Sequence, residues 1–200
     1  MQNKDYLLPG VAAIFVAVIS PIYWLGMSQW VGDFYVLGQD MTSLGFPDIL
    51  FAAILLLTIY IYLNLKNILN EQLNFNHIDL LVWIYAAINI LWMSTLFLDV
   101  AITVLPENIV TQNKDTFLNI GLSMSIGAIV ILGIIDLLIG ILLLTKSTEL
   151  PTLLKIFAIM SVIQGVIGIT VVFAATLIFI FPITMIILAM FFLRKPESLE

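Results

Sequence analysis

Long hydrophobic blocks separated by short polar segments make up most of this chain. Five blocks cover residues 8–30, 47–69, 79–105, 117–145 and 152–193. A helix needs about 20 apolar residues to cross the hydrocarbon core of a bilayer, and every block reaches that length. Segments this long satisfy their backbone hydrogen bonds in lipid only as helices, so the pattern predicts membrane-spanning α-helices and excludes a barrel.

The last block is too long to be one helix. At 1.5 Å per residue, residues 152–193 would extend about 63 Å, twice the roughly 30 Å of the hydrocarbon core. We therefore predict two helices, over residues 152–173 and 176–194, joined by a tight apolar turn near Phe173 to Thr176. Pro182 then lies inside the sixth helix and is expected to kink it.

The distribution of basic residues also favours six helices. With six helices and both termini in the cytoplasm, only Lys114 lies outside, whereas five helices divide the basic residues four against three. Because cytoplasmic loops are enriched in lysine and arginine, the first arrangement is preferred. The basic residues that it places inside are Lys4, Lys66, Lys146, Lys155, Arg194 and Lys195.

The chain is therefore expected to form one all-α integral membrane domain over residues 1–200, a bundle of six transmembrane helices with both termini cytoplasmic. The predicted helices cover approximately residues 8–30, 47–69, 79–105, 117–145, 152–173 and 176–194. Composition agrees: 62% of the residues are hydrophobic and 10% are charged, against roughly 45–50% and 25% in soluble domains. We expect a multi-pass protein of the cell membrane (the cytoplasmic, inner membrane in a bacterium), with the lipid bilayer around it.

The residues that the chain lacks exclude several classes of chemistry. It has no cysteine and one histidine, His77. It therefore offers no thiolate ligand for zinc or an iron–sulfur cluster, and no second histidine for a haem. Its basic residues are scattered singly, without the stripe that follows a phosphate backbone. We expect no metal, no cofactor, no nucleic-acid partner and, since the known catalytic motifs are missing, no catalytic residues.

Ionisable residues inside a membrane span are the default candidates for a functional site. Asp136 lies in the predicted fourth helix, and Asp99 lies in the outer third of the third helix. Folding the fourth and fifth helices into a hairpin about residue 148 or 149 brings Asp136 level with Ser161. The same fold brings Gly133 level with Gln164. We therefore predict that Asp136 is hydrogen-bonded to Ser161 or Gln164.

Small residues should let these two helices approach closely. Gly133 and Gly140 lie seven residues apart on the fourth helix, and Ser161, Gly165 and Gly168 give the fifth helix a small face. Such faces allow the backbones of neighbouring membrane helices to touch. A close contact between the fourth and fifth helices is therefore expected around Asp136.

The predicted third helix carries one polar and aromatic stripe. Tyr85, Asn89, Trp92, Asp99 and Thr103 fall at offsets 0, 4, 7, 14 and 18, which lie on one face of a continuous helix. Lipid does not solvate an amide or a carboxyl group, so this face should point toward other helices. Trp92, at mid-helix, should pack inside the bundle.

Other aromatic residues cluster at the predicted ends of helices, where membrane proteins carry interfacial belts. We interpret these clusters as such belts rather than as a ligand cage. They are Trp24, Trp30, Phe34 and Tyr35 at the outer end of the first helix, and Tyr60 and Tyr62 near the inner end of the second.

Two functions are compatible with these features. The first, which these features favour, is a non-enzymatic accessory, assembly or sensory component, whose partners are other membrane proteins or further copies of this chain. In that case Asp136 only pins helix packing. The second is a small-solute or proton- or cation-coupled transporter that uses Asp136, Gln164 and Asn89. A mid-membrane cavity lined by Asp136 and Gln164 would favour transport, whereas a dry, closed contact would favour a structural role.

An intramembrane enzyme has the least support among the functions considered. A two-aspartate protease needs its aspartates at one depth in the membrane. Asp99 and Asp136 are expected at opposite depths, the first outer and the second inner. The sequence therefore predicts that the protein is not an enzyme.

Overall fold

The computed structural model describes residues 6–37, 45–146, 148 and 150–194, and these residues form helices and turns without any strand. Among them, six stretches are long and apolar enough to cross a membrane, which confirms the predicted number of spans. Lys4 and Lys195, which entered the charge argument, lie outside the described residues. The helices are α1 (Leu7–Leu37), α2 (Phe46–Leu73), α3 (Asp79–Met93), α4 (Leu96–Val104), α5 (Glu107–Gln112), α6 (Lys114–Thr145), α7 (Thr152–Thr170), the 3-10 turn η1 (Ala174–Thr176) and α8 (Leu177–Leu193).

The last hydrophobic block forms two helices, as its length requires. Helix α7 ends at Thr170 and α8 begins at Leu177, so the connection starts slightly earlier than the predicted turn at Phe173. Val171 has a φ of 52°, a conformation that branched residues rarely adopt, and it ends the helix. Pro182 lies inside α8, and its side chain is buried.

The third span is not one continuous helix. It is interrupted at Ser94 and Thr95, between α3 and α4. The Ser94 hydroxyl donates a hydrogen bond to the carbonyl oxygen of Leu91 (2.5 Å), and the Thr95 hydroxyl donates to that of Trp92 (2.8 Å). Side chains that bond to the backbone in this way compete with the helical ladder and bend helices. The predicted single helix over residues 79–105 is therefore wrong at its centre.

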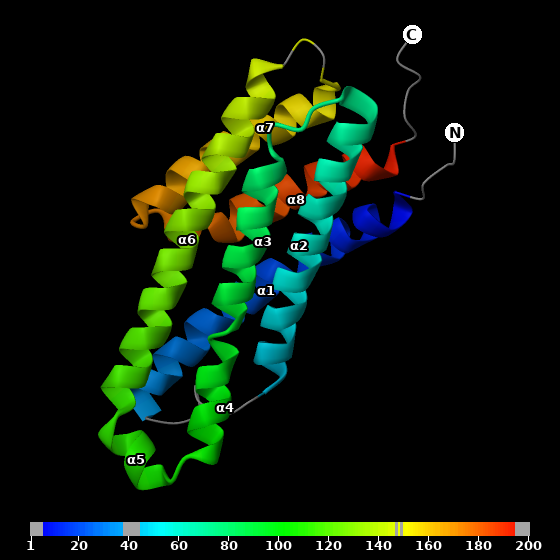
Figure 1. The fold of residues 1–200 in the computed structure, drawn as a ribbon. Coiled ribbons are helices and arrows are strands. Elements are labelled where there is room, and N and C mark those ends of the chain that lie inside the picture. The colour runs from blue at the N-terminus through cyan, green and yellow to red at the C-terminus, as the bar shows by residue number, and fades with distance from the viewer. Residues whose placement is uncertain (1–5, 38–44, 147, 149, 195–200) are drawn as a thin grey trace.

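The spans form a closed ring in chain order. Helix α1 packs on α2, α2 on α3, α3 on α6, α6 on α7 and α7 on α8, and α8 returns to α1. In Figure 1, α2, α3 and α6 run along one direction, and α1, α7 and α8 cross them obliquely. Gly10 of α1 lies against Leu193 and Phe192 of α8, so the start of the first span and the end of the last lie together.

Helices α6 and α7 make the closest contact, as their glycines predict. A Cβ atom on Gly165 would lie 2.6 Å from the carbonyl oxygen of Gly133 and 2.5 Å from the backbone nitrogen of Leu137. A Cβ on Gly140 would lie 2.6 Å from the carbonyl oxygen of Ala158. Only glycine permits backbones to come this close.

The tightly packed core occupies one half of the length of the bundle, around the C-terminal ends of α2, α6 and α8. The other half is less filled: α4 has no buried residue, and the first buried residue of α6 is Ala128. Gly168, near the end of α7, packs against Gly133 and Ile129, so α6 continues roughly 20 Å beyond α7. Side chains that fill the packed half include Leu65, Leu69, Ile139, Leu143, Leu154, Phe157 and Leu188.

The glycine contact predicts a specific stability change. Gly165→Ala places a methyl group against backbone atoms of α6 and should cost about 1–3 kcal/mol, because the backbones must separate. Gly127→Ala is the matched control: a Cβ there meets no atom within 4 Å, and alanine favours the helix. Thermal unfolding of the purified protein in detergent should show a lower midpoint for Gly165→Ala only. Equal midpoints for the two variants would contradict the packing.

Candidate functional site

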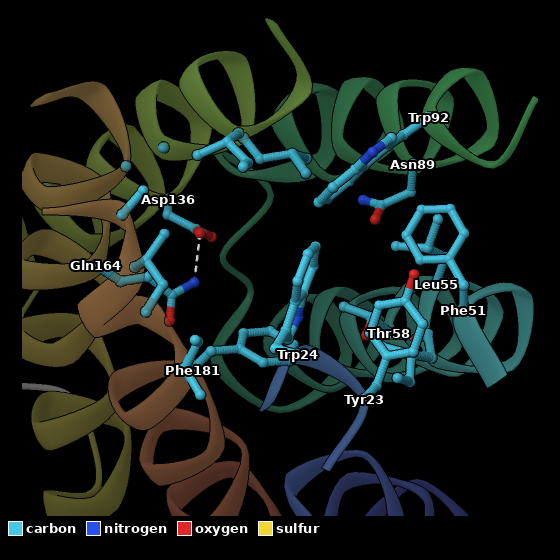
Figure 2. Close-up of a pocket in the computed structure, with 18 of the residues that line it drawn as sticks. Tyr23, Trp24, Phe51, Leu55, Thr58, Asn89, Trp92, Asp136, Gln164 and Phe181 are labelled. Atoms are coloured by element: carbon cyan, nitrogen blue, oxygen red, sulfur yellow. Dashed lines mark hydrogen bonds between the residues drawn. The ribbon is translucent and has the colours of Figure 1, made fainter. Parts of the chain in front are cut away.

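Asp136 of α6 lies at the centre of a hydrogen-bonded cluster that joins three helices. Its side chain is 3% exposed. The Tyr62 hydroxyl of α2 donates to Oδ1 at 2.9 Å, and Nε2 of Gln164 in α7 donates to Oδ2 at 2.6 Å. Figure 2 shows the Asp136–Gln164 bond. Each carboxyl oxygen thus has one donor, as a polar group surrounded by apolar side chains requires.

Of the two predicted partners of Asp136, Gln164 forms the hydrogen bond and Ser161 does not. The close backbone contact at Gly133 and Gly165 carries the neighbouring Gln164 side chain to Asp136. Ser161 is fully buried in the same interface, but within the described part of the chain its hydroxyl has no hydrogen-bond partner. Of the two alternatives, the longer amide side chain is the one that reaches the carboxyl group.

Sequence reasoning missed Tyr62, whose assignment to an interfacial belt is wrong. The side chain is 1% exposed, and its ring stacks on that of Tyr85 with a centroid distance of 4.2 Å and an interplanar angle of 10°. A signal was present on α2: Thr58 and Tyr62 lie one helical turn apart and share a face with the buried Leu55 and Leu65. Two polar positions on an otherwise apolar inner face indicate a partner inside the bundle.

A cavity of about 300 Å³ lies inside the ring beside this cluster. Asp136 and Gln164 line one end of it, and its other lining residues come from all six spans, as Figure 2 shows in part. Along α2 the lining runs from Phe51 to Thr58 and stops before Tyr62. From Tyr62 toward the C-terminal end of α2, the packed core begins. The cluster therefore forms the floor of a hollow that lies on the α5 side of the bundle.

Aromatic rings build the opposite wall of the cavity. Tyr23 stacks on Phe51 (5.7 Å between centroids), Phe51 meets Trp92 edge-on (5.4 Å), and Trp24 lies 6.0 Å from Trp92. Trp92 is buried, as predicted. Trp24 lines the cavity beside it, which corrects its assignment to an outer belt. The side chains of Trp30, Phe34 and Tyr35, the other members of that predicted belt, lie outside the description.

The stripe predicted on the third span is only half correct. Asn89 is 1% exposed, lines the cavity and donates to the carbonyl oxygen of Tyr85 at 2.8 Å. Asp99, however, is half-buried on α4 and does not line the cavity, and Thr103 is exposed. The break at Ser94 and Thr95 explains the difference, because the offsets assumed one continuous helix.

The remaining chemistry of the bundle is limited. Within the described ranges, no three histidine, aspartate or glutamate side chains gather in a way that would hold a metal ion.

Comparison with known proteins adds no assignment: no family model, no curated protein and no solved structure matches this chain. The function must therefore be argued from the geometry of the cluster and its cavity.

The cluster predicts a difference between two neighbouring tyrosines. Tyr62→Phe removes the donor to Asp136 Oδ1 and should lower the free energy of unfolding by about 1 kcal/mol. Tyr60→Phe is the control, since Tyr60 is 38% exposed and should tolerate the change. Unfolding by sodium dodecyl sulfate in mixed micelles measures both. A Tyr62→Phe protein as stable as the parent would show that the bond does not hold α2 to α6.

Proposed function

We propose that this chain is an integral membrane protein that crosses the bilayer six times with both termini in the cytoplasm, and that it is a small-solute carrier. In this proposal the solute binds in the cavity beside Asp136, without chemical conversion. The observation that supports it is the position of the Asp136–Gln164 pair at the floor of a space of about 300 Å³. Ligand-binding cavities begin at about this volume.

The cavity supports transport over a purely structural role for Asp136. A carboxyl group that only pins helices is expected in a closed contact, with packed side chains on every side. Here the packed core begins about one helical turn away, at Leu65 of α2 and Ile139 of α6, but the pair itself lines the cavity. Keeping polar groups at a hollow inside a membrane protein is costly, and such groups typically mark a substrate path.

The sidedness of the packing supports a carrier of the alternating type. The core is dense between the cavity and the end of the bundle where α1 begins and α8 ends. With cytoplasmic termini, the cavity then lies on the outer side of Asp136, and the dense half separates it from the cytoplasm. Transport requires this half to open in a second conformation while the outer half closes.

The role of an accessory, assembly or sensory component, which the sequence favours first, remains a prediction. No feature of the described residues argues for it specifically, whereas the cavity argues for binding. The expectation that the protein is not an enzyme also remains a prediction.

The proposal predicts that one of the two intramembrane aspartates matters for transport. Asp136→Asn should abolish solute-driven currents, because it removes the charge at the cavity floor, whereas Asp99→Asn should retain them, because Asp99 lies outside the cavity. Proteoliposomes on a solid-supported membrane, challenged with a panel of small amines, acids and neutral solutes, give this comparison. Currents that persist in Asp136→Asn would refute the carrier. So would the absence of a current in the parent protein with every solute of the panel.

A further inference from the structure

Several hydrogen-bond donors that line the cavity are already engaged within the protein. Four lining side chains direct a donor hydrogen to acceptors within the protein. Thr58 donates to the carbonyl of Ile54, Asn89 to that of Tyr85, Trp92 to Ser125 and Gln164 to Asp136. Each of these four side chains therefore uses one donor hydrogen within the fold.

Some hydrogen-bond acceptors of Asp136 and Gln164, at the polar end of the cavity, remain without a donor among the described residues. Oε1 of Gln164 is buried and has no hydrogen-bond partner in the described part of the chain, although the residue is only 6% exposed. A carboxylate has about four lone-pair positions, and Asp136 uses two of them. A buried acceptor without a partner is destabilising, so a ligand that supplies donors here gains what the free protein lacks.

Charge narrows the class of ligand further. The described residues that line the cavity include no lysine, arginine or histidine, and Asp136 is their one carboxyl group. An anionic ligand would place a second negative charge beside it in an apolar medium, which is strongly unfavourable. A ligand with a positive charge forms a paired, hydrogen-bonded contact instead.

The aromatic wall indicates what the rest of the ligand looks like. Opposite the Asp136–Gln164 pair lie the rings of Trp24, Trp92 and Phe51, and Phe181 closes a further side (Figure 2). Aromatic faces bind apolar groups by burial and attract nearby cations through their ring electrons. The cavity is therefore polar at one end and aromatic at the other.

We propose that the cavity binds a small lipophilic amine in its protonated form, with the ammonium group donating hydrogen bonds to Asp136 and Gln164 Oε1. The apolar body of the amine lies against Trp24, Trp92 and Phe51. The volume of about 300 Å³ limits the ligand to a compact molecule with a single ring or a short chain. This inference rests on the proposed function for its site and names the substrate class of that site.

Direct binding tests the inference separately from transport. The probe is 2-phenylethylammonium, titrated into the purified full chain in detergent and followed by tryptophan fluorescence, since Trp24 and Trp92 line the cavity. The matched anion 3-phenylpropionate has a similar apolar body and the opposite charge. We expect saturable binding of the amine, at least tenfold weaker binding of the anion, and no loss of amine affinity in Asp99→Asn.

Two variants examine the polar end. Asp136→Asn should weaken amine binding at least tenfold, and Gln164→Met, which keeps the side-chain volume but removes Oε1 together with the Nε2 donor to Asp136, should weaken it severalfold. The second variant keeps the test decisive if the first does not fold. Equal binding of amine and anion, or amine binding unchanged in both variants, would overturn the inference.

The outcomes also separate this inference from the carrier proposal. Asp136-dependent binding of the amine without any flux would refute the carrier and keep the ligand class. Asp136-dependent flux of an acid or a neutral solute, with no amine binding, would keep the carrier and refute the ligand class.

Discussion

A carboxyl group inside an apolar bundle must find hydrogen-bond donors, and this constraint organises the protein. Asp136 takes one donor from α2 through Tyr62 and one from α7 through Gln164, so it holds three spans together. The contact of Gly133 with Gly165 brings α7 close enough for Gln164 to reach. The sequence thus combines one costly residue with the small residues that allow it to be satisfied.

The same cluster divides the bundle into two unlike halves. On one side, large aliphatic side chains pack tightly between α2, α6, α7 and α8. On the other side, the third span is interrupted between α3 and α4, α6 runs beyond α7, and aromatic rings line a cavity. A bundle built only for stability has no reason to leave this space beside its one fully buried carboxyl group within the described chain. The proposed binding function rests on this asymmetry.

Features set by length and local spacing were predictable from the sequence. Block lengths gave six spans, and folding α6 and α7 about their loop placed Gln164 near Asp136 together with the glycine contact. Features set by three-dimensional packing were not. Tyr62 looks like an interfacial tyrosine until α2 is placed against α6, and the break at Ser94 depends on hydroxyl-to-carbonyl bonds that compete closely with a continuous helix. The cavity needs all six spans in place.

The proposed carrier requires that water reach the hollow beside Asp136 from the outer side of the membrane. The chain has no native cysteine, so single cysteines report without background. Thr58→Cys lines the cavity, Leu56→Cys faces outward on the same helix, and Ile61→Cys is packed in the core. In intact cells, a small, charged methanethiosulfonate that does not cross membranes should label only Thr58→Cys, because the thiolate forms in water. Labelling of Leu56→Cys or Ile61→Cys at the same rate, or no labelling of Thr58→Cys, would contradict the account.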